Sequence, residues 1–345
     1  GHASYHLSEL YSLFRTLPQI VRSFLDKKAA NDLQTFTNVS LAETWVEEAE
    51  ELEADVLARR AIPYAAEVPA GVGVLTAGVD MQQDRLEVEV VGWGLGEESW
   101  NVDYRVFWGD PLGSEVWDQL FEYRDRLFRH ETGAEMKISA MCVDTGGDGG
   151  LTQSAYERLA GKHTRRIFAI KGVGGWSRPV VSAPAKKTTG KRGRPVTLFT
   201  VGTDETKLIV ARRFKLEGGP GACHFPIDAR DPEYFAQLTA ERLVTRWIKG
   251  FPFREWHASR PRNEALDCRV YAYAALKIEK PNIAGRLAKL EASAEEHETP
   301  STASSPSDAD GKPPEDQGKP ARKTKPRKTR RSRRRRGAGP GLDGW

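Results

Sequence analysis

Three aspartates lie in otherwise apolar segments, where a charged side chain is not expected. Asp80 lies in VLTAGVDMQ, Asp144 ends ISAMCVD, and Asp267 lies in ALDCRVYAYAAL. An unpaired carboxylate is seldom buried, because removing its charge from water costs far more than a buried methylene gains. A shared divalent cation would offset that cost, since Mg²⁺ is held in proteins by one or two carboxylates, waters and substrate phosphates. The pattern therefore indicates a metal site.

Carboxylates gathered in this way are suited to a two-metal centre. Two cations about 3.5–4 Å apart activate a water and stabilise the leaving oxygen when a phosphodiester is displaced in line. Three auxiliary side chains could assist: Glu264, one turn before Asp267 on the same helix face; Asp148, in the loop TGGDGG; and Lys171, which ends RRIFAIKG and could reach a phosphate.

Each of these side chains also has a structural explanation. Asp144 could be a turn residue before Gly-Gly. Asp267 could be an exposed helix position or an ion-pair partner of Arg262 or Arg269. Lys171 could be a solvated loop lysine. For any one acid the structural explanation is the more common, and only the three together favour a metal. Asp84, Asp103, Asp110 and Asp148 are expected to be turn or edge charges, and Asp148 is the one of them expected to come nearest the site.

Other active-site patterns are absent from the sequence. It holds no G-x-x-x-x-G-K-[ST] phosphate loop, no glycines in dinucleotide-binding spacing, no H-E-x-x-H and no evident nucleophile elbow. The three cysteines include no C-x-x-C pair, which argues against zinc and against a disulfide framework. They are expected to be small core residues in a reducing compartment.

The segments around the aspartates predict an α/β fold. From Gly71, VGVLTAGVDMQ, RLEVEVVGWG and SWNVDYRVFWG predict an antiparallel meander, with the alternation of half-buried strands in the second and third. A helix over SEVWDQLFEYRDRLFRH, a buried strand ISAMCVD, a short helix near residues 154–159 and a buried strand RRIFAIKG follow. This order is that of a ribonuclease-H-like mixed sheet, in which a three-strand meander is joined by parallel strands and helices cover both faces.

Such a sheet would bring the aspartates together. In mixed sheets ligands gather at the carboxyl ends of the parallel strands. Asp144 ends the first parallel strand, and Asp80 lies two residues after Gly78 in the first strand of the meander. If these two strands are neighbours, their carboxylates are too, and the final helix NEALDCRVYAYAALKI would carry Asp267 to the same edge. Residues 177–195 are expected to form an exposed loop or hairpin tip.

Three parts are expected along the chain. Residues 1–70 are predicted to be a helical connector, in which Ser40 and Glu43 have the capping-box spacing of a helix start. Residues 71–292 are predicted to form the ribonuclease-H-like domain. Residues 293–345 hold almost no large apolar side chain and are expected to be a disordered tail. No apolar stretch is long enough to span a bilayer and the first residues do not resemble a signal peptide, so an intracellular protein is expected.

The positive charge of the sequence is concentrated in this tail. The net charge is +4, and residues 322–336 hold 11 basic residues and no acid, which leaves 4 − 11 = −7 elsewhere. Such a run binds polyanions through counterion release, so double-stranded DNA is the expected partner. The alternative is a solubilising tail that binds nothing specific. The predicted DNA-binding residues are Arg322, Lys323, Arg330, Arg331, Arg333 and Arg334.

Several motifs resemble a known family. LTAGVDMQQDRLEVEVVGWGLGEESW, CVDTGG, FAIKG, EYFAQLTAE and above all RNEALDCRVYAYAA resemble the large subunit of phage DNA packaging terminases of the lambda gpA type, from HLSELYS to Leu276. The resemblance implies the carboxy-terminal nuclease domain, a Mg²⁺- or Mn²⁺-dependent endonuclease that cuts concatemeric viral DNA. It implies that Asp80, Asp144 and Asp267 are the catalytic and metal-binding acids, with two ions.

The resemblance also implies partners and a setting. Members of this family carry an ATPase motor with a phosphate loop before the nuclease, and this chain is expected to begin after that motor. A terminase small subunit, the portal of the procapsid and the cytoplasm of a bacterial host are further implications, for a phage or prophage protein with no membrane segment. Two alternatives stay open: a resolvase or transposase of the same fold, and a non-catalytic module that binds DNA or docks on the portal.

Overall fold

The structure is a computed structural model that describes most of the chain before residue 299. The described residues are 5, 7–29, 35–43, 46–48, 53–148, 150–188, 194–227, 229–248 and 251–298. The predicted basic run and its DNA-binding arginines and lysine lie outside these residues. The tail was expected to begin at Ser293, but helix α9 (Ile283–Glu298) continues past that residue, so the predicted boundary is too early.

The amino-terminal elements differ from the helical connector that the sequence predicts. They are η1 (Glu9–Tyr11), α1 (Leu17–Ala29), the π-helical turn η2 (Phe36–Ser40), β1 (Val46–Glu48) and α3 (Ala54–Arg59). The helix predicted to start at Ser40 is wrong, because β1 pairs antiparallel with β11 (Glu241–Ile248), with Val46 opposite Arg246. Pairing with a strand distant in sequence outweighs the local helix propensity of this acidic segment.

The main sheet confirms the predicted fold class. Within the described residues its strand order is β10-β4-β3-β2-β6-β7-β9-β8, with β5 paired to β6 beside this path. The strands are β2 (Val74–Met81), β3 (Arg85–Trp93), β4 (Ser99–Trp108), β5 (Leu127–Arg129), β6 (Glu135–Asp144), β7 (Ile167–Val173), β8 (Ala185–Thr188), β9 (Pro195–Gly202) and β10 (Cys223–His224). The strands β2, β3 and β4 form an antiparallel meander. The strand β6 pairs parallel with β2, β7 with β6, and β9 with β7, as in a ribonuclease-H-like sheet.

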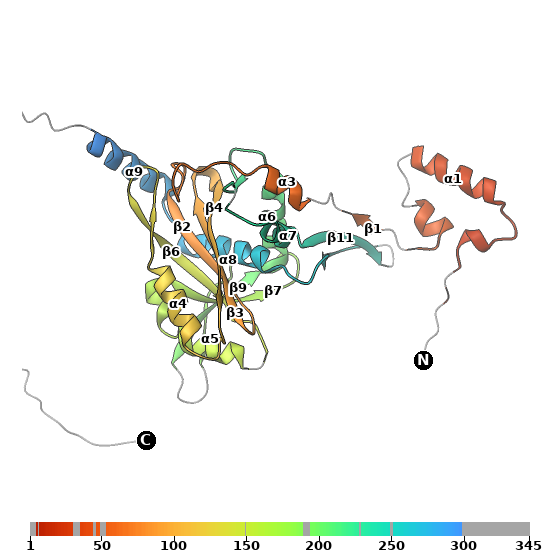
Figure 1. Ribbon diagram of the computed structural model, residues 1–345. Coiled ribbons are helices and arrows are strands. Elements are labelled where there is room, and N and C mark those ends of the chain that lie inside the picture. Colours follow the sequence, from red (N-terminus) through yellow and green to blue (C-terminus); the bar gives the residue numbers. More distant parts are fainter. Residues whose placement is uncertain are drawn as a thin grey trace, which may run out of the picture. The chain divides into compact units, whose positions relative to one another are not determined.

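Helices cover both faces of this sheet (Figure 1). One core holds apolar side chains of α4 (Glu115–Arg124) and α5 (Leu151–Leu159). The core on the other face holds α6 (Thr203–Phe214), α7 (Pro232–Leu238) and α8 (Glu264–Glu279), and α8 packs on β2, β3 and β6. All eight residues of β2 are buried, as expected for a strand covered on both sides.

Three local predictions need correction or refinement. The helix predicted to reach His130 ends at Arg124, because residues 127–129 form β5 and pair with β6. The strand β3 is buried on both faces rather than half-buried, since Glu87 and Glu89 face arginines instead of water. The segment 177–195 is a hairpin in its described part, where β8 pairs antiparallel with β9.

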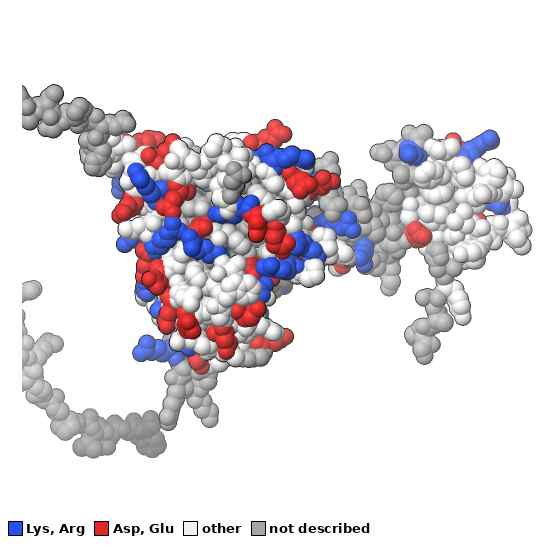
Figure 2. Space-filling model, in the orientation of Figure 1, with Lys and Arg blue, Asp and Glu red and all other residues white. Residues whose placement is uncertain are grey.

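A second, three-stranded sheet is separate from the main sheet. Its order is β1-β11-β12, and β12 (Phe251–Ala258) pairs antiparallel with β11. All three cysteines are buried and free, as predicted. Acidic and basic side chains are interspersed over the face of the body that Figure 2 shows. Among the described residues no helix combines the length and the apolar character that crossing a membrane requires.

Candidate metal centre

Two of the predicted aspartates lie at the ends of neighbouring strands. Asp80 is the penultimate residue of β2 and is 5 % exposed; Asp144 is the last residue of β6. The strands β2 and β6 are parallel, with Val79 opposite Val143, so the two aspartates occupy the next pair of positions. The first strand of the meander is therefore beside the first parallel strand, which fulfils the condition under which the sequence brings the two carboxylates together.

The third aspartate reaches this edge because α8 lies unusually close to β2. A Cβ atom at Gly78 would stand 2.0 Å from the carbonyl oxygen of Cys268 and 2.4 Å from the amide nitrogen of Ala272. Only glycine permits this approach. The hydroxyl of Thr76 donates to the carbonyl of Ala272 at 2.8 Å and fixes the register of the helix on the strand. Asp267, in the first turn of α8, consequently faces the ends of β2 and β6.

Burial and, after it, the negative charge of Asp267 raise the pKa of both Asp80 and Asp144. Burial, followed by the negative charge of Asp267, raises the pKa of Asp80 well above its usual value, and Asp144 adds to this effect. The amide of Gln82 opposes it by donating to Asp80 Oδ2 at 2.5 Å. Burial likewise raises the pKa of Asp144 to about 6, against backbone N–H groups that include that of Gly146. The charge of Asp267 thus acts on both other aspartates, as expected for carboxylates at the same edge of the sheet.

The carboxylate of Asp267 is held by side-chain donors. Burial raises the pKa of Asp267, and the neighbouring ammonium group of Lys207 lowers it. Lys207 Nζ lies 3.1 Å from Asp267 Oδ1, and Asn263 Nδ2 donates to Asp267 Oδ2 at 3.0 Å. The alternative partners considered from the sequence are wrong, since Arg262 and Arg269 pair with other acids.

The donor set fits a hard divalent cation. Asp144 Oδ1 is buried and has no hydrogen-bond partner among the described residues. Carboxylate oxygens are the ligands that Mg²⁺ and related cations prefer. Within the described part of the chain no three His, Cys, Asp or Glu side chains are grouped closely enough to hold a metal ion. Asp80 and Asp267 are each engaged by a protein donor. A cation would have to share those oxygens with the donors.

The predicted auxiliary residues take different positions. Glu264 lies on the first turn of α8, where it pairs with Arg85 at 2.6 Å and with Arg262 at 3.4 Å. Its charge is one of the causes that raise the pKa of Asp267. Asp148 is exposed in the loop before α5. Lys171 is exposed on β7, one residue beyond the partner of Asp144 in the strand pairing.

Four polar residues near the aspartates escaped the sequence reasoning. They are Gln82, Lys207, Glu241 and Asn263. Gln82 follows β2 directly, and Asn263 precedes α8 at a position typical of a helix cap. The local sequence around each residue could therefore have pointed to it. Lys207 and Glu241 had no such local signal, because their partners lie on elements distant in sequence.

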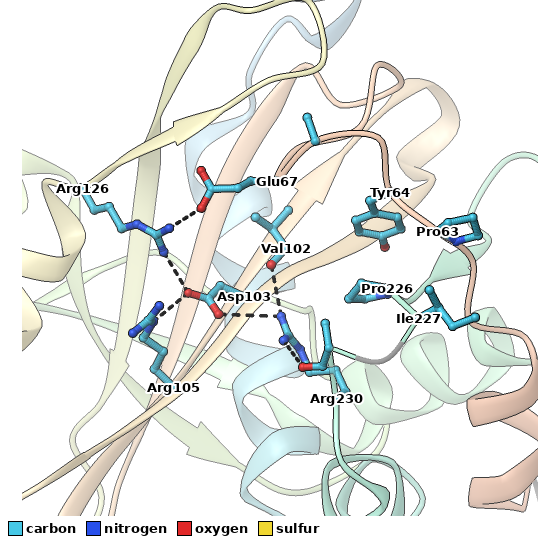
Figure 3. A pocket seen from close by; sticks show the side chains of 12 residues that line it. Pro63, Tyr64, Glu67, Val102, Asp103, Arg105, Arg126, Pro226, Ile227 and Arg230 are labelled. Carbon is cyan, nitrogen blue, oxygen red and sulfur yellow. Dashed lines mark hydrogen bonds and ion pairs between the residues drawn. The ribbon is translucent and has the colours of Figure 1, made fainter.

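A separate cavity of about 410 Å³ lies at the edge of the sheet (Figure 3). At its centre Asp103 accepts from Arg105 at 2.8 Å and from Arg126 at 3.0 Å, and Arg230 lies 3.8 Å away. Asp103, expected to be an edge charge, is thus an ion-paired residue of β4. None of the three candidate aspartates lines this cavity, so it is distinct from the candidate metal centre.

The raised pKa values predict a characteristic pH dependence for the metal-free protein. Between about pH 4 and pH 6 the folded chain retains the proton of Asp144 that the unfolded chain has released, so the free energy of unfolding falls as pH rises. Asp80 acts in the same direction. Thermal unfolding in EDTA should therefore show a smaller loss of Tm over this range for Asp144→Asn than for the unchanged protein. An equal loss in both proteins would contradict the prediction.

A family model and two curated relatives agree on one family. Residues 2–287 match the family described as "Terminase large subunit gpA, endonuclease domain". The large terminase subunit of Enterobacteria phage P21 is 40% identical over 309 residues, which cover 86% of this chain and 47% of that protein. The large terminase subunit of Escherichia phage lambda is 40% identical over 287 residues, covering 80% and 43%. The chain thus spans about half the length of the curated relatives it matches. Among solved structures, the large terminase of bacteriophage HK97 aligns with a TM-score of 0.33 and 12% identity, over 76% of this chain and 51% of that one.

Proposed function

This chain belongs to the family of terminase large subunit gpA endonuclease domains, and on that premise we propose that it cuts double-stranded DNA by metal-dependent hydrolysis of a phosphodiester bond. The observation that carries the metal dependence is the placement of Asp80 and Asp144 at neighbouring strand ends, where burial and the charge of Asp267 raise the pKa of both, with a buried Asp144 oxygen that has no partner among the described residues. Such carboxylates are destabilising unless a cation neutralises them.

In this proposal Asp80, Asp144 and Asp267 hold two Mg²⁺ or Mn²⁺ ions. The ions, when bound, supply the activation of a water and the stabilisation of the leaving oxygen. The protein's own part is to fix the three carboxylates. Gln82 orients Asp80, and backbone N–H groups that include that of Gly146 orient Asp144. A like-charge cluster held in this way favours a divalent cation over the protons that would otherwise neutralise it.

The setting follows from the family. We propose that the substrate is concatemeric viral DNA, that a terminase small subunit selects the site of cutting, and that the protein acts with a procapsid portal in the cytoplasm of a bacterial host. The membership in a terminase family favours this role over a resolvase or transposase. The buried carboxylates favour a catalytic role over a role as an inactive docking module. Acids that repel one another at one edge of the sheet would only destabilise a protein that serves as a scaffold.

The test is direct. The purified protein is expected to nick and linearise plasmid DNA in Mg²⁺ or Mn²⁺ and to do neither in EDTA. Titration with Mn²⁺, followed by the electron paramagnetic resonance signal of the free ion, is expected to show two bound ions per chain. Cleavage that persists in EDTA, or a chain that binds no Mn²⁺, would refute the proposal. A strong preference for four-way junctions over linear duplex would instead indicate a resolvase.

A further inference from the structure

Asp267 and three neighbouring side chains form a closed ring of hydrogen bonds. Lys207 Nζ lies 2.6 Å from Glu241 Oε1 and 3.1 Å from Asp267 Oδ1. Asn263 Nδ2 lies 2.6 Å from the same Glu241 oxygen and 3.0 Å from Asp267 Oδ2. Two donors thus each bridge the same two carboxylates. Both oxygens of Asp267 receive a donor, which fixes the plane of its carboxylate as well as its position.

The ring joins three elements that are distant in sequence. Lys207 lies on α6, Glu241 is the first residue of β11, and Asn263 and Asp267 belong to the start of α8. The side chains are largely shielded from water, at 12 % exposure for Lys207 and 9 % for Glu241. Shielding makes ion pairs of this kind strong and makes the loss of one partner costly.

Asn263 takes part in the ring instead of capping the helix, which is the usual role of an asparagine at its position. It is the N-cap residue of α8, and an asparagine at this position usually accepts a hydrogen bond from the first turn of the helix. Here its side chain makes no capping bond and donates to Glu241 and Asp267 instead. The Asn263 side chain therefore hydrogen-bonds to the two carboxylates and leaves the helix end uncapped.

We propose that Lys207, together with Glu241 and Asn263, positions Asp267 for metal binding. This inference rests on the proposed function, because it assigns Asp267 to the metal. Lys207 and Asn263 act through Asp267 and are positioning residues. The ring carries a net charge of −1 − 1 + 1 = −1, so Asp267 keeps an attraction for cations while its orientation is fixed. Groups that hydrogen-bond a metal ligand contribute about 10- to 100-fold to metal affinity in other metal sites.

The test compares Lys207→Met and Asn263→Ala with the unchanged protein. Each variant is expected to raise the Mn²⁺ concentration for half-saturation about tenfold, measured by electron paramagnetic resonance. The half-maximal Mn²⁺ concentration for plasmid nicking should rise equally, and the rate at saturating Mn²⁺ should stay within about threefold, because an ion in excess restores the occupancy. Asn263→Ala should leave the Tm almost unchanged, since the side chain does not cap the helix. The matched control is Lys289→Met, which removes an exposed lysine on α9 and should change neither quantity.

Several results would overturn the inference. Unchanged Mn²⁺ affinity in both variants would mean that the ring only joins α6, β11 and α8. Tighter Mn²⁺ binding by Lys207→Met would mean that the ammonium group competes with the cation. If Lys207→Met does not fold, Asn263→Ala alone decides, through its Mn²⁺ affinity at an unchanged Tm. Absence of Mn²⁺ binding by the unchanged protein would refute the proposed function, and the inference with it.

Discussion

Asp80→Asn is expected to abolish metal-dependent nicking and at the same time to stabilise the metal-free protein. Asparagine keeps the shape of the side chain and can still accept from Gln82, but it removes a buried charge that Asp267 and Asp144 repel. Loss of a metal ligand should lower the nicking rate by more than about 100-fold, since even groups one step removed from a metal contribute 10- to 100-fold. The Tm in EDTA at pH 8 should rise, by about 2–4 °C for each kcal/mol of relieved repulsion.

The chain offers a matched control for this variant. Asp84→Asn makes the same change four residues later, in the turn between β2 and β3, where the side chain is 61% exposed. Its pair with Arg85 is a surface pair, so both activity and Tm should stay close to those of the unchanged protein. A fall in Tm for Asp80→Asn would show that the carboxylate stabilises the fold, and unchanged nicking would remove it from the catalytic centre.

Gly78→Ala is expected to destabilise the protein strongly. The new Cβ would lie 2.0 Å and 2.4 Å from backbone atoms of α8, and backbone cannot rotate away as a flexible side chain can. Overpacking typically costs about 1–3 kcal/mol, and a clash with backbone is expected to lie at the upper end of that range. Chemical denaturation should show the loss directly, and Mn²⁺ affinity should fall because α8 must move Asp267 away from Asp80.

A second glycine tests whether the effect belongs to this contact. A Cβ at Gly218 would meet no atom within 4 Å, so Gly218→Ala should change the free energy of unfolding by less than about 0.5 kcal/mol. If Gly78→Ala folds with unchanged stability and unchanged Mn²⁺ affinity, α8 is not held as closely to β2 as the structure has it.

The main sheet could be predicted well from the sequence, because its strands have characteristic local patterns of apolar residues. The runs around Asp80 and Asp144 are apolar without alternation, which is typical of strands covered on both faces, and the structure buries both. The alternation in β3 misled the prediction, however. Alternation shows which residues share a face, but it does not show whether helix α8 covers that face and supplies Arg269 to pair with Glu89.

The ring around Asp267 could not be predicted for the same reason. Lys207 in TDETKLIV looks like any helix lysine, and Glu241 looks like any polar residue at the start of a strand. Their roles arise only when α6, β11 and α8 pack together, and such packing leaves no periodic signal in any one of the three segments. The β1 strand escaped prediction likewise, because only its pairing with β11 makes it a strand.

The close fit of α8 against β2 also has a consequence for synthesis of the protein. The helix that carries Asp267 follows every strand of the main sheet along the chain. A nascent polypeptide whose translation has not yet reached α8 carries Asp80 and Asp144 without Asp267. It then has only two of the three acids. The proposed DNA-cutting centre is therefore complete only after translation has passed α8.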